Sequence, residues 1–320
     1  TGNTMMRRLD VGPGAKINVT EPSTNALNLQ YFTFTTEILI REEAEVTVTR
    51  TSNVNGPAFR LTGSGSRFTT LEGSKLSVSQ LGMALRGVTT TDVSLGKRSI
   101  NTIQTGWGFT ANYTIRSFVL EDQGTYRYTQ PTSGSTAPAV GTNYASIRVA
   151  QRFVLGEEAA FQATRARTTA DSRFILLNSA NSTVFLGKNS TFDISQSGGI
   201  FQVQTTSTLT LDEGAKLNVL TERGLNTANG GAGGSNLTNA FGTINVGKNA
   251  EFIVRDGYQN QRTTAEFTNR PLVNVGRTFN VGEDATVLIE TTINKSLSSA
   301  VLFFRQANAQ LNLSNVKSFE

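Results

Sequence analysis

Short runs of alternating apolar and polar residues recur along the whole sequence, and each pair of runs is separated by a tight polar turn. The pattern is clearest in LTLDEGAKLNV (209–219), INVGKNAEFIV (244–254) and FNVGEDATVLI (279–289). Alternation with a period of two residues predicts β-strands, and no stretch shows the 3.6-residue period of a helix. The sequence therefore predicts an all-β protein.

A small residue closes the turn of each repeated phrase and marks the repeat along the chain. An Ala or Ser at this corner is expected to avoid crowding the neighbouring copy, and a Gly one or three residues earlier is expected to take a positive φ. Eleven copies follow one another at intervals of 24 to 35 residues, with the small residue at Ala15, Ala44, Ser74, Ser99, Thr125, Ala159, Ser190, Ala215, Ala250, Ala285 and Ala309.

A plainer strand separates successive copies, so that each unit contains about three short strands. The plainer segments are AFRLTG (58–63), MALRGV (83–88), GFTANYT (108–114), SIRVA (146–150), FILLNSAN (174–181), IFQVQTT (200–206) and AVLFFRQ (300–306). Their Phe residues, such as Phe59, Phe174 and Phe201, are expected to stack in the core. One unit cannot bury its apolar face alone, whereas stacked units share one interior.

This arrangement predicts a parallel β-helix of about eleven coils. At ~4.8 Å per coil the rod would be about 50 Å long. A β-sandwich or propeller is the competing architecture, but the regular Asn-Gly or Asp-Gly hairpin turns that it favours do not occur. We expect residues 1–320 to form a single β-solenoid domain that is a segment of a larger surface protein, with outward loops at 129–144, 221–239 and 256–271.

The composition excludes several kinds of chemistry. The chain has no Cys and no His, which rules out disulfides, Cys metal sites and every catalytic triad or zinc site that depends on His. The first residues, TGNTMMRRLD, lack the apolar core of a signal peptide, and no run is apolar enough for a membrane helix. A Thr-, Ser-, Asn- and Gly-rich β-protein without Cys suits an exported Gram-positive bacterial protein.

The charge balance weakly favours an anionic partner. The net charge is +5, and the basic residues are mainly Arg, whose planar fork pairs with carboxylates, sulfates or phosphates. Because these residues are spread along the chain and form no stripe, nucleic acid is not an expected partner. An ordinary mixed surface explains the same charges equally well.

Two groups of aromatic and basic residues are candidate ligand-binding sites. In a solenoid, residues one coil apart are neighbours, and Trp or Tyr can stack on sugar rings while Arg pairs with acidic groups. An ordinary, partly buried aromatic cluster is the alternative. The first candidate site comprises Trp107, Tyr113, Arg116, Tyr126, Arg127, Tyr128 and Tyr144, and the second comprises Arg255, Tyr258, Arg262 and Arg270.

Acidic pairs recur in the turns and raise the question of a bound cation. Stacked carboxylates could hold Ca²⁺, but turns tolerate acidic residues and other copies carry LGKRS, LGKNS or VGKNA at the same place. We therefore expect no metal, no cofactor and no catalytic residue. The acidic pairs are Glu42–Glu43, Glu121–Asp122, Glu157–Glu158, Asp212–Glu213 and Glu283–Asp284.

Phrases such as TLDEGAKLNV (210–219) and NVGKNAEFIV (245–254) resemble the right-handed β-helix of the pectate-lyase superfold. More narrowly, they resemble pectate-lyase-like adhesive domains of Gram-positive cell-wall proteins, including binding regions of lactobacillal serine-rich-repeat adhesins. The resemblance implies a right-handed β-helix that attaches to host surfaces or to polysaccharides, acidic ones included. The lyases of this fold are similar to one another in clustering Asp for Ca²⁺ beside a basic Arg, a pattern that this sequence lacks.

The expected function is that of a non-catalytic, monomeric adhesin module at the bacterial cell surface, anchored to the cell wall through other parts of the protein. Its partner would be a host or environmental glycan or glycoprotein, preferably acidic, with no insertion into a membrane. A polysaccharide lyase of the pectate-lyase fold and a rigid stalk without a ligand remain the alternatives.

Overall fold

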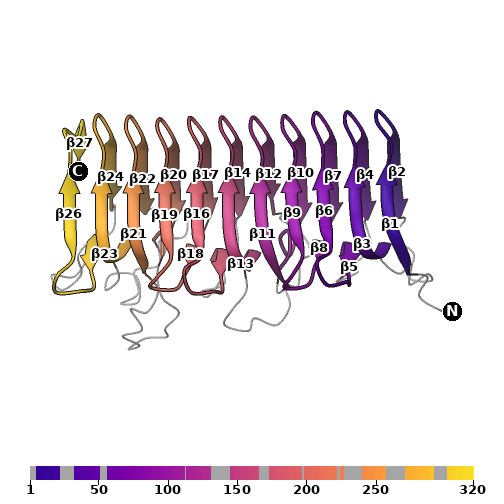
Figure 1. Cartoon of the computed structure of the whole chain (residues 1–320), viewed down its shortest axis with the longest axis horizontal. Coiled ribbons are helices and arrows are strands. Elements are labelled where there is room, and N and C mark those ends of the chain that lie inside the picture. The colour runs from indigo at the N-terminus through magenta and orange to yellow at the C-terminus, as the bar shows by residue number, and fades with distance from the viewer. Residues whose placement is uncertain are drawn as a thin grey trace.

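The computed structural model describes residues 5–21, 32–50, 56–111, 113–130, 145–165, 173–196, 198–221, 224–226, 240–256, 271–291 and 301–320. Within these residues the chain forms strands β1 to β27 and no helix. All strand pairs are parallel, and they build one 16-stranded and one 11-stranded sheet, called here sheet A and sheet B. Figure 1 shows the strands lying side by side from β1 at one end to β26 and β27 at the other.

Sheet B contributes one strand to each coil. Its strands follow one another in chain order, so every coil pairs with the coil before and the coil after it. The strands are β2 (Lys16–Glu21), β4 (Glu45–Arg50), β7 (Lys75–Gln80), β10 (Ile100–Thr105), β12 (Thr125–Thr129), β14 (Ala160–Arg165), β17 (Thr191–Gln196), β20 (Lys216–Thr221), β22 (Glu251–Asp256), β24 (Thr286–Glu290) and β27 (Ser318–Phe319).

Sheet A runs alongside sheet B and also has one strand in each coil. These strands are β1 (Met6–Val11), β3 (Phe32–Ile40), β6 (Arg67–Thr70), β9 (Asp92–Leu95), β11 (Thr114–Leu120), β13 (Ala145–Leu155), β16 (Thr183–Leu186), β19 (Thr208–Leu211), β21 (Phe241–Val246), β23 (Val273–Val281) and β26 (Gln310–Leu313).

Some coils have a further strand in a branch of sheet A, and we call the surface of this branch the third face. The branch forms because long strands pair twice: β3 pairs with β5 through Phe32–Phe34 and with β6 through Glu37–Ile40. The additional strands are β5 (Pro57–Leu61), β8 (Met83–Arg86), β15 (Arg173–Leu177), β18 (Gly199–Gln202) and β25 (Leu302–Phe304). The predicted all-β class and parallel β-solenoid architecture are confirmed.

Tight turns join sheet A to sheet B along the upper edge of Figure 1. In each turn the residue before the closing small residue donates its backbone N–H to a carbonyl of the next turn, as Glu43 does to Glu72 at 3.0 Å. This residue has a left-handed φ of 54° to 67°, which only Gly adopts without strain. It is Gly14, Glu43, Gly73, Arg98, Gln123, Glu158, Asn189, Gly214, Asn249 or Asp284.

The predicted role of the small residue is confirmed in most turns, since residues such as Ala44, Ser74 and Ala215 are fully buried. Two positions were wrong. In the fifth turn the small residue is Gly124, because Thr125 already begins β12. Ala309 closes a different turn, immediately before β26.

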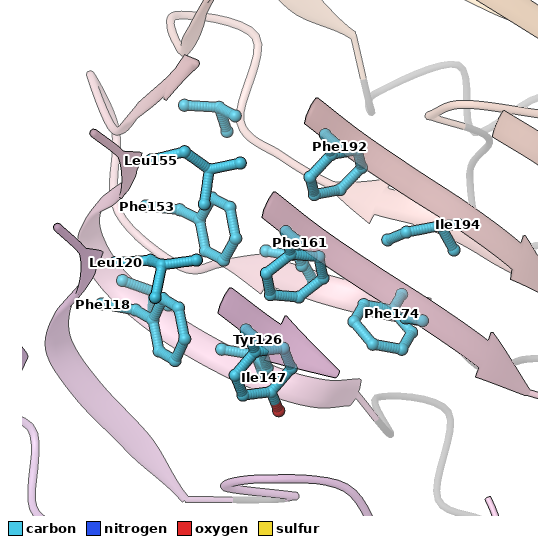
Figure 2. Packing of buried hydrophobic residues seen from close by; sticks show 14 of the residues in the cluster. Phe118, Leu120, Tyr126, Ile147, Phe153, Leu155, Phe161, Phe174, Phe192 and Ile194 are labelled. Atoms are coloured by element: carbon cyan, nitrogen blue, oxygen red, sulfur yellow. The ribbon is translucent and has the colours of Figure 1, made fainter. Parts of the chain in front are cut away.

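The core lies between the sheets and is filled by the inward positions of every strand. Phe118 and Phe153, which are partners in the register of β11 and β13, stack with ring centroids 5.2 Å apart and planes 6° apart. Figure 2 shows these rings beside Phe161 and Phe192, which come from the opposite sheet. The predicted core positions of Phe59, Phe174 and Phe201 are confirmed, because each is at most 2% exposed.

The three loop segments predicted as outward insertions, 129–144, 221–239 and 256–271, lie for the most part outside the described residues. At the corner where the chain leaves sheet B, buried polar side chains fix the backbone. Gln80 donates to the carbonyl of Gly56 at 3.2 Å, and Gln130 donates to that of Gly106 at 3.3 Å. The corner between sheet B and the third face is therefore held by hydrogen bonds from side chains to the backbone.

Candidate anion-binding groove

Among the described residues, the structure brings together two of the aromatic residues predicted for the first site. Trp107 and Tyr113 are partly buried and pack against Met83 and Ala111, in the segment between β10 and β11. This segment occupies the third face in one of the coils without a separate third-face strand. Tyr144 lies outside the described residues.

Tyr126 and Tyr128 do not belong to a surface site, which corrects the sequence-based prediction. They are 0% and 2% exposed, because the inward positions of β12 direct both rings into the core. Burial raises the pKa of the Tyr126 phenol well above its ordinary value. Tyr128 donates its hydroxyl to the carbonyl oxygen of Thr105 at 2.8 Å. Neither ring can stack on a ligand outside the solenoid.

Arg116 and Arg127 lie apart from the two aromatic residues. Arg116 donates from Nε to Oδ1 of Asp92 at 2.8 Å and from its terminal nitrogen to the second carboxylate oxygen, so its fork is occupied. Arg127 is exposed on the outer face of sheet B, between Thr102 and Gln162 in register. The structure therefore does not unite them with Trp107 and Tyr113.

Of the four residues predicted for the second site, the structure describes Arg255 alone. Arg255 donates from Nε to Glu290 of the next coil at 3.0 Å, and both side chains are partly exposed. Tyr258, Arg262 and Arg270 lie outside the described residues.

A groove of about 660 Å³ on the third face gathers basic residues that the sequence analysis had not selected. Its walls come from β5, β8, the start of β11 and the first half of β13. The lining residues that the following argument uses are Arg60, Arg86, Tyr113, Thr114 and Arg148. Of the predicted site residues that the structure describes, Tyr113 alone lines this groove.

Arg60 and Arg86 are neighbours in the groove because β5 and β8 pair in parallel register at these residues. Adjacent strands lie about 4.8 Å apart, so the two side chains leave the third face side by side. The Nε atom of Arg60 is buried and has no hydrogen-bond acceptor among the described residues. Two adjacent cations with an unsatisfied donor are a costly arrangement unless an anion lies between them.

Arg86 is positioned by an aromatic ring. Its guanidinium carbon lies 4.2 Å from the centroid of the Tyr113 ring, a cation–π contact, and no carboxylate among the described residues pairs with Arg86. Tyr113 itself is held by packing on Met83 and Ala111 and by its backbone N–H, which donates to the carbonyl of Thr110 at 3.0 Å.

Arg148 forms the far side of the groove. Its backbone N–H donates to Oγ1 of Thr110 at 2.8 Å. With the Asn178 amide oriented so that its oxygen faces Arg148, that oxygen accepts from Nε at 2.9 Å and from Nη2 at 3.0 Å. Partial burial lowers the pKa of the Arg148 guanidinium from its ordinary value. The contacts with Thr110 and Asn178 are both to neutral groups.

No Asp or Glu occurs among the described residues that line the groove. Elsewhere several arginines have acidic partners in a neighbouring coil: Arg41 pairs with Asp10, Arg98 with Glu72 and Arg116 with Asp92. The groove is thus a concave, basic site in which the neutral side chains of Tyr113 and Asn178 contact the guanidinium groups of Arg86 and Arg148. Such forks suit carboxylate, sulfate or phosphate oxygens.

Neither a protein-family model, a curated protein nor a solved structure matches the chain. The described residues also contain no helix that is long and apolar enough to cross a membrane.

Two of the acidic pairs of the turns form ion pairs with a lysine of the preceding turn. Lys188 pairs with Glu213 at 3.2 Å, and Lys248 pairs with Glu283 at 2.8 Å. Within the described part of the chain, no group of three or more acidic side chains is placed to hold a metal ion.

A signal for the groove was present in the sequence. The plainer segments AFRLTG, MALRGV and SIRVA each carry one Arg, at Arg60, Arg86 and Arg148, and in each case it follows a buried apolar residue. Aligning these segments with one another would have placed the three arginines in one row of the third face. Searching for clustered aromatic residues instead selected core positions.

Proposed function

We propose that the chain is a non-catalytic adhesive module of a cell surface and that it binds an acidic polysaccharide or an acidic glycoprotein. The observation that carries this proposal is the groove of the third face, where Arg60, Arg86 and Arg148 converge without an acidic lining residue. Sugars with carboxylate or sulfate groups carry the negative charge that such a groove favours.

The rigid solenoid supports this role physically. Binding residues on regular strands of a stacked sheet keep their spacing, so little conformational entropy is lost when a long ligand is bound. A groove that lies along successive coils also suits an extended polymer better than a compact small molecule. We place the site of action outside the cell, where such polymers are found.

The proposal is tested by isothermal titration of the wild-type chain with polygalacturonate, dextran sulfate and neutral dextran. We expect both acidic polymers to bind, neutral dextran not to bind, and the affinity to fall as salt is raised, because exposed charges are screened over ~8 Å at physiological ionic strength. Binding of neither acidic polymer would refute the proposal and favour a stalk without a ligand.

A second measurement separates binding from catalysis. Polygalacturonate incubated with the chain and Ca²⁺ is monitored by ultraviolet absorbance for unsaturated product. A binding module leaves the absorbance unchanged, whereas a steady rise would identify a lyase and overturn the non-catalytic part of the proposal.

A further inference from the structure

We infer that Arg60 and Arg86 jointly hold a single oxyanion of the ligand and that Tyr113 fixes the position of the Arg86 fork. This inference rests on the proposed function and deepens it by naming the group that is recognised: a carboxylate or sulfate carried by an acidic sugar unit. Three observations carry the inference: the register of the two arginines, the unsatisfied donor of Arg60 and the ring contact of Arg86.

The register fixes the distance between the two cations. Arg60 and Arg86 are direct partners in the pairing of β5 and β8, so their side chains begin about 4.8 Å apart and project from the same face. One carboxylate or sulfate has enough oxygen atoms to accept hydrogen bonds from two guanidinium groups at once. A single oxyanion therefore satisfies both side chains, whereas two separate anions would repel each other at this spacing.

The burial of Arg60 gives a second reason. Its Nε is buried and lacks an acceptor among the described residues, although the guanidinium group still reaches the groove. A donor withdrawn from water without an acceptor destabilises the unliganded groove. An oxyanion at the mouth of the groove would hydrogen-bond the remaining guanidinium nitrogens and offset the repulsion between the two cations.

Tyr113 supplies the third part of the site as a positioning residue. Its ring lies against the Arg86 guanidinium, at 4.2 Å from ring centroid to guanidinium carbon, and so limits the movement of the fork. Because the partner of Arg86 is a ring and not a carboxylate, its N–H groups stay available to an anion. Arg148 lies two coils beyond Arg86, about 10 Å along the axis, and therefore contacts a different unit of the ligand.

The decisive experiment is a double-mutant cycle measured by titration with oligogalacturonates and with dextran sulfate. Arg60→Gln and Arg86→Gln each remove one fork, and we expect each to weaken binding about 10- to 100-fold, the range for a hydrogen bond to a charged group. Because both forks hold the same oxyanion, the double variant should bind only slightly more weakly than either single variant.

Arg127→Gln is the matched control, since it removes the same charge from an exposed side chain on the outer face of sheet B. It should change affinity less than about twofold. Equal losses for Arg127→Gln, Arg60→Gln and Arg86→Gln would show that only net charge matters and would overturn the inference. Additive losses in the double variant would overturn it as well, because they indicate two separate anions.

Two further arms complete the test. Arg60→Lys keeps the charge and loses the fork, so binding should remain several-fold weaker than in the wild type. The unliganded Arg60→Gln variant should unfold at the same or a higher temperature than the wild type, because it removes repulsion between neighbours.

A wild type that binds no acidic polymer refutes the proposed function, whereas normal binding by Arg60→Gln and Arg86→Gln refutes only this inference. The tighter of the two polymers identifies the oxyanion as carboxylate or sulfate.

Discussion

Tyr126 and Phe161 stack face to face in the core, with ring centroids 4.6 Å apart and ring planes 9° apart. The contact follows directly from the register, because the two residues are partners in the pairing of β12 and β14. The stack continues to Phe192 in the next coil, at 5.2 Å from Phe161. Unlike the two Phe residues of this stack, Tyr126 carries a hydroxyl group, which is buried and has no hydrogen-bond partner in the described structure.

Replacing Tyr126 with Phe is expected to stabilise the protein. The ring stack is kept, and the cost of burying an unsatisfied hydroxyl, about 1–3 kcal/mol, is removed. We expect the free energy of unfolding to rise by about 1 kcal/mol, measured by urea denaturation. Affinity for acidic polymers should not change, because the residue is fully buried. A decrease in stability would show that the hydroxyl is satisfied.

The turns between sheet A and sheet B use glycine for two different reasons, which two substitutions can separate. Gly73 has a φ of +67°, where a Cβ would meet only the flexible carboxylate of Glu43. Gly96 lacks a positive φ, but a Cβ there would lie 2.5 Å from the carbonyl oxygen of Thr70 in the preceding coil. Gly73 is required because of its positive φ, and Gly96 is required because the neighbouring backbone leaves no room for a Cβ.

Gly96→Ala is expected to destabilise the solenoid more than Gly73→Ala. The left-handed conformation costs Ala about 1–2 kcal/mol, whereas forcing two backbones apart costs about 1–3 kcal/mol and disturbs a second coil. Chemical denaturation of both variants measures the difference. Gly14→Ala is the control for Gly73→Ala, since Gly14 has a φ of +65° with nothing within 4 Å of its Cβ position. A larger loss for Gly14→Ala than for Gly96→Ala would contradict this explanation.

Arg116 and Asp92 provide a prediction for the dependence of stability on pH. Hydrogen bonds from Arg116 hold the pKa of the Asp92 carboxyl below its ordinary value, against the opposing effect of partial burial. A lowered carboxyl pKa stabilises the fold above the unfolded-state value of about 3.9, and this contribution is lost as pH falls through the folded-state pKa. Asp92→Asn should therefore lower the free energy of unfolding at pH 7.

The expected loss is below about 1 kcal/mol, because Arg116 is 42% exposed and solvent screens the pair. Denaturation curves at pH 7 and at about pH 2 test it, and the difference between the two proteins should be smaller at the lower pH. Arg116→Gln should leave the affinity for acidic polymers unchanged, since Asp92 already occupies the fork. A tenfold loss of affinity would show instead that Arg116 contacts the ligand.

The sequence predicted the solenoid because its interior imposes the same requirement on every coil. Inward positions such as Leu217 and Val219 must be apolar, and a small residue such as Ala215 must close the turn, so the pattern repeats where the packing repeats. The same regularity caused the errors at Tyr126 and Tyr128. Their position in the alternation of TYRYT marks them as inward, but their chemistry suggested a surface role.

The groove was harder to predict because it depends on an interruption of the repeat. The segment that carries Tyr113 replaces a strand on the third face, and only the folded chain shows that its ring reaches Arg86. Arg60 and Arg86 are 26 positions apart in sequence and become neighbours through register alone. Residue type identifies possible ligand contacts, but the register decides which of them meet.

Replacing Asp193, on the outer face of β17, with a neutral residue should stabilise the protein. Partial burial raises the pKa of its carboxyl, while a hydrogen bond from Asn218 at 3.3 Å acts in the opposite direction. Because the folded state binds the proton more tightly, the wild type should become more stable as pH falls from neutral through the folded-state pKa toward the unfolded value of about 3.9.

Asp193→Asn removes this dependence and should raise the free energy of unfolding at pH 7 by a few tenths of a kcal/mol, a small gain because the side chain is partly solvated. An amide is compatible with this position, since Asn280 donates to Asn245 of the adjacent coil at 2.7 Å in a similar outward row of sheet A. Urea denaturation of both proteins between pH 4 and pH 7 measures the effect, and a variant less stable than the wild type at pH 7 would show that the carboxylate contributes favourably to the fold.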